Sequence, residues 1–335
     1  MSQIKTAVSL YSLQDQYARK KMSLDDIFKF VTDMNAGIEF ISDQMLHGTP
    51  HPSDEVLKQW DALVEKYHPE LVCNDIFINS CLYENRTLTH KEQVNMLIDE
   101  IKLSHRLGFP MVRLVSKTDP SLIEPALPYA EKYNVIITQE IHAGMSFDNP
   151  YTKGYVDVMK KLNSPYVGLT VDTGIFCNKI ARVFVDYFRY LGVGEYMIDF
   201  FDKIYEKGMC TRQYYLKNCK EGQLLPDDVA RLVQSETDRD YALLTDSFET
   251  SPFSILDDYM PYVKHIHGKL FEMTEDGEEY CIPYREFIKY LKDNNYDGYI
   301  STEYEGNRFT LPGNPVRDKE NVMAHQKMLK KYIEE

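Results

Sequence analysis

Basic clusters are missing from this sequence. The chain carries 52 Asp and Glu residues against 38 Lys and Arg, which gives a formal net charge of -14, and no segment forms a long run of lysines and arginines. An acidic protein repels nucleic acids and anionic lipid surfaces unless a local basic patch overcomes its net charge. The composition therefore predicts neither a nucleic-acid partner nor a role on a membrane surface.

Long apolar segments are missing as well. No stretch approaches the roughly 20 consecutive apolar residues of a transmembrane helix. The first residues, MSQIKTAVSLYS, have neither the apolar core nor the cleavage pattern of a signal peptide. We therefore expect no membrane partner and a cytoplasmic location.

Paired cysteines are the third absence. The six cysteines occur singly, without a CxxC pair, at positions 73, 81, 177, 210, 219 and 281. This spacing suits reduced thiols better than a disulfide framework or a zinc site built on cysteines.

What the sequence does contain is a regular alternation of short β-type runs with helical patterns. Alternation of this kind predicts a parallel sheet with crossover helices. Eight such runs occur, at residues 6–12, 37–43, 70–77, 111–116, 135–142, 166–174, 263–271 and 298–306. Eight strands, each followed by a helix, are the count of a (β/α)8 TIM barrel. The expected fold class is therefore α/β, with residues 1–335 forming a single TIM-barrel domain.

Several helix starts can be read directly between these runs. Three pairs of residues match the capping box, in which the first side chain accepts a free backbone N–H and the fourth returns the bond. They are Ser23 with Asp26, Thr89 with Glu92, and Ser121 with Glu124. Each pair predicts the beginning of a helix.

One interval between strands is much longer than the others. It separates the sixth run from the seventh, and its excess of about residues 178–255 has aromatic-rich helical text such as FVDYFRYLGVGEYMIDFFDKIYEK. We interpret it as a helical insertion after strand six. Exposed aromatic patches commonly mark contacts, so the insertion is expected to be a lid or a docking surface for a partner, or else a self-packed extension of the barrel.

Titratable side chains gather at the ends of the last four runs. In a strand, residues i and i+2 share a face, and the chemistry of this barrel class sits at the C-terminal ends of the strands. This parity turns the following side chains toward one mouth of the barrel: Glu140, His142, Asp172, His265, His267, Lys269, Ser301, Glu303 and Glu305. Taken singly, each would be explained as a solvated loop residue, a helix cap or a core histidine. These structural explanations do not account for all of them together, because burying so many unpaired polar groups in one cavity costs free energy.

The carboxylates among these residues predict a metal site. Glu140, Asp172 and Glu303 would repel one another in a shared cavity, and a divalent cation removes this repulsion. Three carboxylates with one imidazole suit Mn²⁺ or Mg²⁺, with Co²⁺, Fe²⁺ or Zn²⁺ as alternatives. His265 and His267 have the same parity, so either can supply the imidazole. His142 shares the face of Glu140 but lies one step beyond the level of the metal site. It is expected to transfer a proton to or from a bound substrate, unless it is a hydrogen-bonded histidine at the edge of the loop.

Four motifs at these strand ends resemble a known group of enzymes. VxxxQEIHxG (135–144), TVDTG (170–174), KHIHGK (264–269) and STEYEG (301–306), in this order, are similar to the xylose isomerase-like TIM barrels, the sugar phosphate isomerase/epimerase group. The resemblance implies that Glu140, Asp172, His267 and Glu303 hold a divalent metal, with Mn²⁺ as the expected ion. It implies His267 because the group's ligand occupies that position, and His265 remains its rival.

A narrower resemblance covers nearly the whole chain. VSLYSL (8–13), EFISDQM (39–45) followed by HPSD (51–54), QEIHAG (139–144) and STEYEGNR (301–308) are similar to the catalytic alpha subunits of bacterial C-glycoside deglycosidases. This implies a lyase that works with a small beta subunit and cleaves the sugar–aglycone carbon–carbon bond of 3-oxo-glucosides by C2 deprotonation and elimination. His142 is then the expected C2 base, and Glu305 or Lys269 assists protonation and positioning.

Three other functions compete with this interpretation. A metal-dependent isomerase or epimerase of keto-sugars or sugar phosphates would use a second carboxylate, which Glu39 or Asp43 on the second run could supply. A metal-dependent endonuclease of the same fold would need a basic surface for its nucleic acid. A non-catalytic sugar-binding barrel could keep the ligand set without turnover.

Overall fold

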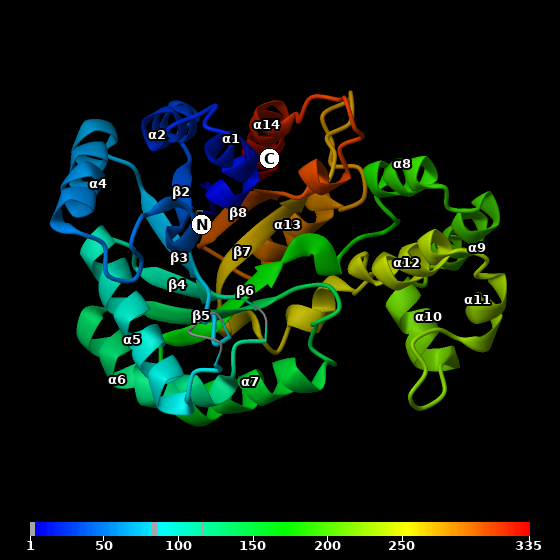
Figure 1. Cartoon of the computed structure of the whole chain (residues 1–335), viewed down its shortest axis with the longest axis horizontal. Coiled ribbons are helices and arrows are strands. Elements are labelled where there is room, and N and C mark those ends of the chain that lie inside the picture. Colours follow the sequence, from blue (N-terminus) through cyan, green and yellow to red (C-terminus); the bar gives the residue numbers. More distant parts are fainter. Residues whose placement is uncertain (1–3, 82–85, 116) are drawn as a thin grey trace.

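The computed structural model describes residues 4–81, 86–115 and 117–335. Eight parallel strands close into a barrel in sequence order, which confirms the predicted TIM barrel (Figure 1). The strands are β1 (Lys5–Ser9), β2 (Gly37–Ile41), β3 (Leu71–Ile76), β4 (Met111–Leu114), β5 (Ile136–Ile141), β6 (Val167–Asp172), β7 (Val263–Leu270) and β8 (Tyr299–Tyr304).

Helices surround the barrel on its outer side (Figure 1). The α-helices outside the insertion are α1 (Gln14–Ala18), α2 (Leu24–Asp33), α3 (Ser42–Met45), α4 (Asp54–Tyr67), α5 (His90–Leu107), α6 (Ile123–Tyr133), α7 (Pro150–Leu162), α13 (Tyr284–Asp293) and α14 (Asp318–Glu334). The 3-10 helices there are η1 (Leu10–Leu13), η2 (Pro120–Leu122), η3 (Thr173–Ile175), η5 (Phe253–Leu256), η6 (Met260–Tyr262) and η7 (Gly306–Phe309). In the described part of the chain, no helix is long and apolar enough to cross a bilayer.

Several strands end earlier than the sequence predicts. The first run was expected to reach residue 12, but β1 ends at Ser9 and the chain continues as η1. The sixth run likewise passes into η3 after Asp172. In both places most residues of the turn stay buried, so their pattern resembles that of a strand. Position 116, at the end of the fourth run, lies outside the described residues.

Two of the three predicted capping boxes are confirmed, at Ser23 and at Thr89. The third prediction is wrong. Pro120 begins the 3-10 turn η2, whose cap is Asp119, and α6 follows this turn without a side-chain cap. The hydroxyl of Ser121 instead lies 2.9 Å from His90 Nε2.

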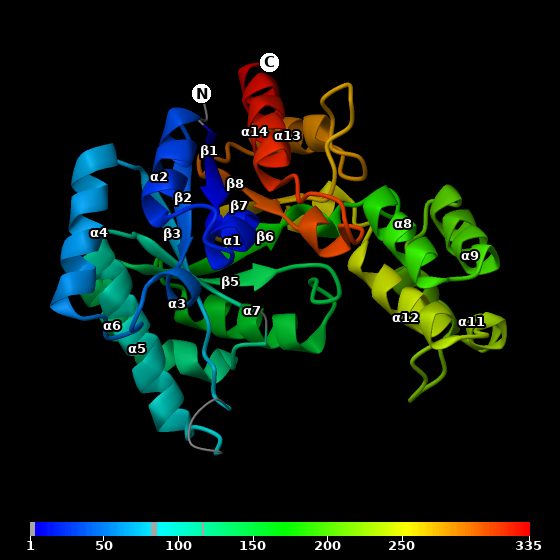
Figure 2. The ribbon, with the colours of Figure 1, turned by 45° about the horizontal axis from the view of Figure 1, so that its top comes forward.

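The predicted helical insertion lies between β6 and β7 and extends to one side of the barrel (Figure 2). It consists of α8 (Arg182–Leu191), α9 (Glu195–Glu206), α10 (Thr211–Asn218), α11 (Asp227–Leu232), α12 (Glu236–Leu244) and η4 (Thr245–Ser247). Most of its aromatic side chains point inward, and Phe184, Phe201 and Tyr241 are almost fully buried.

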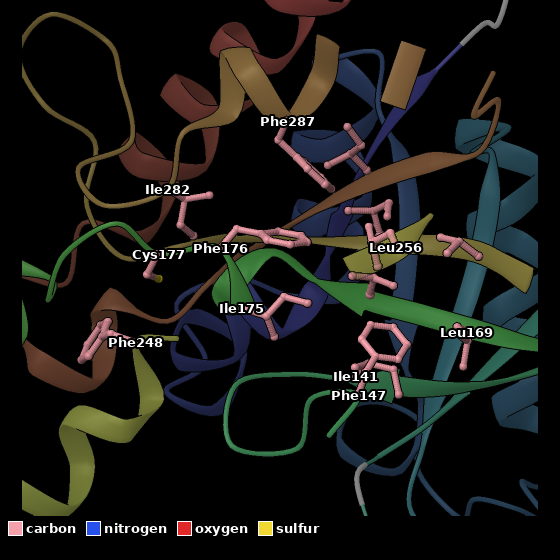
Figure 3. Packing of buried hydrophobic residues seen from close by; sticks show 14 of the residues in the cluster. Ile141, Phe147, Leu169, Ile175, Phe176, Cys177, Phe248, Leu256, Ile282 and Phe287 are labelled. Atoms are coloured by element: carbon pink, nitrogen blue, oxygen red, sulfur yellow. The ribbon is translucent and has the colours of Figure 1, made fainter. Parts of the chain in front are cut away.

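The insertion and the barrel share one hydrophobic core. Phe248, which follows the insertion's last helix, packs against Phe271 at the end of β7 with ring centroids 5.1 Å apart. Closer to the barrel, Phe176 packs beside Phe287. Ile141 of β5 and Leu169 of β6 belong to the same hydrophobic core (Figure 3). Burial of these side chains anchors the insertion close to the C-terminal ends of β5, β6 and β7.

Candidate active site

The four expected metal ligands converge at the C-terminal mouth of the barrel. Glu140, Asp172, His267 and Glu303 are all buried, and each offers one ligand atom within 4.8 Å of the others. Asp172 lies opposite His267 in the strand register. Glu140 lies opposite Thr170, two residues before Asp172, and Glu303 lies opposite Lys269, two residues after His267. This offset is the stagger that tilted strands need to close a barrel, and it brings alternate residues of four strands to one level.

Only one of the two rival histidines belongs to this cluster. His267 Nδ1 lies 3.0 Å from Glu140 Oε1 and 3.5 Å from Glu303 Oε1. His265 lies two residues earlier on β7, where it contacts Glu39 instead. Among the described residues, His267 is therefore the histidine that completes the set of three carboxylates.

Two permanent cations lie among the carboxylates. Lys269 Nζ is 2.8 Å from Asp172 Oδ2 and 2.7 Å from Glu303 Oε2. Arg113, on β4, reaches Glu303 Oε1 with Nη2 at 3.4 Å and places Nε 3.3 Å from Asp75 on β3. The sequence interpretation missed Arg113 and Asp75, although a charged residue within a buried strand was a signal that could have pointed to them.

The charges in and below this mouth do not balance. Among the described residues, three permanent cations, Arg113, Lys269 and Arg308, face six carboxylates. These are Glu39, Asp75, Glu140, Asp172, Glu303 and Glu305. Asp172 Oδ2 is buried and has no hydrogen-bond partner of good geometry. An excess of buried carboxylate oxygens around one imidazole fits a divalent cation.

The pKa values express the same imbalance. Burial would raise the pKa of Glu140, but the charge of Arg113 and the bond from His267 hold it well below its usual range. Burial raises the pKa of Asp172 to about 6 despite the nearby Lys269. Burial disfavours charge on His267, yet the carboxylates of Glu39 and Glu303 outweigh this and raise its pKa well above the usual value. Protons thus supply part of the positive charge that the cluster requires.

His142 lies just past the end of β5 and lines the cavity over the cluster. Its ring Nδ1 is 2.7 Å from the carbonyl oxygen of Ala143. Because a carbonyl can only accept, Nδ1 carries the proton of this bond, and the second nitrogen, Nε2, keeps its lone pair. In this tautomer His142 can act as a base.

The cavity has a volume of about 350 Å³, within the range for small-molecule sites. Its walls include Tyr11, Phe77 and Phe271, and Ser247 comes from the insertion. Larger hollows of about 700 and 540 Å³ exist elsewhere on the described residues, but neither is lined by any member of the ligand cluster. The chemistry of the lining, rather than its size, identifies the candidate site.

Glu305 and Lys269 lie on the wall of this cavity, as their parity predicts. Glu305 Oε1 accepts hydrogen bonds from Tyr11 Oη at 3.3 Å and from Arg308 Nη1 at 3.2 Å. Its other oxygen, Oε2, lies 3.4 Å from Lys269 Nζ. The sequence interpretation did not foresee Tyr11 and Arg308, which come from the 3-10 helices η1, after β1, and η7, after β8.

The two acids expected on strand two do not reach the cavity. Glu39 is fully buried below the ligand cluster, against His265 and His267. Asp43 lies in α3 with an exposed side chain and is absent from the cavity wall. In this structure neither carboxylate lines the cavity, since β2 turns Glu39 into the barrel interior and Asp43 lies on the exposed side of α3.

The insertion also contacts the loop that carries His142. Arg212 of α10 reaches Asp148 Oδ1 with Nη2 at 2.9 Å and the carbonyl of Gly144 with Nη1 at 3.5 Å. Glu249 Oε2 accepts a hydrogen bond from Gly144 N at 3.4 Å. The insertion therefore helps to hold residues 143–149 in place.

Comparison with known proteins gives relatives along most of the chain. The C-glycoside deglycosidase alpha subunit of Arthrobacter globiformis is 29% identical over 328 residues, which cover 94% of this chain and 88% of that protein. The 3'-dehydrocarminate deglycosidase alpha subunit of a Microbacterium species is 26% identical, with 92% and 90% covered. The resemblance indicated by the sequence motifs is confirmed.

A solved structure shares the fold at much lower identity. D-psicose 3-epimerase from Clostridium cellulolyticum H10, solved with D-tagatose, superposes with a TM-score of 0.58 and 12% identity over 98% of this chain and 99% of that chain. No family model matches the sequence.

Proposed function

We propose that this chain is a metal-dependent C-glycoside deglycosidase alpha subunit, a lyase that cleaves the sugar–aglycone carbon–carbon bond of 3-oxo-glucosides. The proposal rests mainly on one observation, a buried cluster of four potential metal ligands beside a cavity that His142 lines. The four residues are Glu140, Asp172, His267 and Glu303. The names of full-length relatives support the same activity.

The ketone at C3 of the sugar makes the neighbouring C2 hydrogen acidic, and His142 takes this proton on Nε2. Glu140, Asp172, His267 and Glu303 would hold a divalent cation, which would supply positive charge to stabilise the negative charge that develops on the C3 oxygen. We expect Mn²⁺ because the donor set is rich in carboxylate oxygens and has one imidazole.

Elimination then breaks the bond between C1 of the sugar and the aglycone carbon. The electron pair of the former C2–H bond forms a C1–C2 double bond, and the pair of the broken bond leaves with the aglycone carbon. That carbon takes up one proton, so the reaction is balanced without an oxidant or water. Lys269 and Glu305 share an ion pair on the cavity wall and are the groups we assign to protonation and positioning.

The partner that we propose is a small beta subunit, since the relatives are named alpha subunits. We place its docking surface on the outer side of the insertion. Six exposed large apolar side chains of the described residues lie there: Tyr190, Leu191, Tyr196, Leu216, Leu224 and Leu244. Apolar groups exposed in this way commonly mark protein contacts. We also propose a cytoplasmic location, which suits the six free cysteines.

An isomerase or epimerase of keto-sugars is the second candidate, favoured by the fold shared with D-psicose 3-epimerase. Such an enzyme commonly needs a second base, and the strand-two acids expected for this role do not line the cavity. The same metal cluster would serve either reaction, so the products must decide between them.

The test uses the Mn²⁺-loaded protein, with and without a candidate beta subunit. One sample receives a 3-oxo C-glucosyl flavonoid and another receives free keto-hexoses, and the His142→Phe variant serves as the control. Release of the aglycone, lost in the variant, is the expected result. Interconversion of the free sugars without release of the aglycone would select the epimerase instead.

A further inference from the structure

Glu39 lies inside the barrel, beneath the ligand cluster, and is fully buried. It comes from β2, which is not a neighbour of β7 in the barrel. Its Oε1 lies 2.9 Å from His267 Nε2, and its Oε2 contacts His265 Nε2. One carboxylate thus spans the barrel interior and meets two histidines of a single strand.

The two nitrogens of His267 face different partners. Nδ1 faces the carboxylates of the cluster, 3.0 Å from Glu140 Oε1. Nε2 faces Glu39. A neutral imidazole has one N–H and one lone pair, and a carboxylate favours the N–H on the nitrogen that faces it. A cation in the cluster would take the place of the proton on Nδ1, and the N–H that remains would be the one on Nε2, which faces Glu39.

We propose that Glu39 is a positioning residue that fixes the tautomer and the ring plane of His267 for binding a divalent cation. His265 holds the second oxygen of Glu39 and prevents the carboxylate from rotating away. The inference rests on the metal site of the proposed function and extends it by two residues that do not line the cavity.

The composition of this layer supports a functional role. The interior of a TIM barrel is usually filled by bulky branched apolar side chains. Here Glu39, His265 and His267 fill part of it without any exposed surface. A buried carboxylate is costly unless it is paired, and apolar residues would pack this space at a lower cost. Orientation of a metal ligand accounts for a polar group at this place.

The same three residues could alternatively share an ion of their own, because each offers one ligand atom within 4.8 Å of the others. In that arrangement Glu39 would be a ligand and the chain would bind two cations. In the arrangement we propose, Glu39 contacts histidine nitrogens directly and the chain binds one. The number of bound ions distinguishes these possibilities.

The experiment compares the wild-type chain with Glu39→Gln and His265→Gln. Glu100→Gln is the matched control, because Glu100 is also a buried carboxylate but lies on α5, away from the cavity and the cluster. The number of Mn²⁺ ions per chain, their dissociation constant and the electron paramagnetic resonance spectrum of bound Mn²⁺ are measured. Circular dichroism verifies folding.

We expect the wild type and the control to bind one Mn²⁺ equally well. Glu39→Gln is expected to bind one Mn²⁺ about 10–100-fold more weakly, with an altered spectrum, as for other groups that orient a ligand. His265→Gln is expected to weaken binding by a smaller factor. If Glu39→Gln does not fold, Glu39→Asp, which draws the carboxylate back by about 1.5 Å, is expected to show the same weakening.

A folded Glu39 variant with wild-type affinity and spectrum would overturn the inference. A wild type that binds two ions, one of which is lost in Glu39→Gln, would also overturn it and make Glu39 a ligand. A wild-type chain that binds no divalent cation has a different meaning, because it removes the metal site and with it the proposed function.

Discussion

Lys269 Nζ lies 2.8 Å from Asp172 Oδ2, inside the set of side chains that we assign to a metal ion. The same ammonium group also contacts Glu303 Oε2 at 2.7 Å. Two of the three carboxylates of the cluster are therefore shared between a lysine and the proposed cation. The positions of the lysine and of the cation depend on each other.

Lys269→Gln is expected to tighten Mn²⁺ binding by at least about tenfold, because it removes a positive charge that competes for Asp172 and Glu303. Deglycosidase turnover should fall in the same variant, since Lys269 lines the cavity. Isothermal titration calorimetry measures the first effect and aglycone release the second. Weaker binding in the variant would show that Lys269 supports the metal site instead of competing with it.

His142→Phe is expected to lower the rate of aglycone release by a factor of about 10²–10⁴ or more, the usual contribution of a general base. Its metal content should equal that of the wild type, because His142 is not one of the four clustered ligands. Metal analysis by mass spectrometry and a kinetic assay test both halves. Retained activity would exclude His142 from the mechanism.

Arg113→Met is expected to destabilise the metal-free protein by about 3–5 kcal/mol, because it leaves buried carboxylates without their cation. Arg113 contacts Asp75, Glu140 and Glu303. The matched control is Arg106→Met, which breaks an exposed pair with Asp61 and should cost about 1 kcal/mol or less. Urea unfolding measures both, and equal losses would contradict the structural role of Arg113.

His325 predicts a specific acid sensitivity. It is fully buried on α14 beside Thr302, and burial lowers its pKa from 6.5 to about 3. Between pH 6.5 and pH 3 this histidine is therefore protonated in the unfolded chain but neutral in the folded chain. As the pH falls through this range, the free energy of unfolding decreases by up to about 1.4 kcal/mol per pH unit. Above about pH 6.5 this group no longer makes stability depend on pH.

His325→Gln keeps a polar side chain but removes the titration. Between pH 6.5 and pH 5 it should lose less stability than the wild type, by about 2 kcal/mol. Urea unfolding at several pH values provides the comparison. Parallel pH profiles for the two proteins would contradict a neutral, buried His325.

The sequence was sufficient to predict the barrel and the ligand cluster because both depend on local periodicity. Alternation along β5 to β8 placed Glu140, Asp172, Glu303 and both His265 and His267 on one face, the family resemblance favoured His267, and the barrel stagger aligns the four residues. The capping-box pattern gave the right helix starts at Ser23 and Thr89, because it involves only neighbouring residues of the chain.

The rest depends on contacts between distant parts of the chain. Arg113 reaches across the barrel to Glu303, 190 positions later, and no local pattern encodes that contact. Glu39 has the parity of a mouth residue but lies one layer lower, since strand tilt sets its depth. Ser121 is not a cap because Pro120, three residues before the start of α6, begins a 3-10 turn.

The most direct test is anomalous diffraction at the manganese edge from crystals of the chain grown with Mn²⁺. We predict a single strong peak at the barrel mouth, within about 2–2.3 Å of oxygens of Glu140, Asp172 and Glu303 and of Nδ1 of His267. Crystals without such a peak, in which Lys269 and Arg113 still bridge these carboxylates, would contradict the metal-dependent lyase.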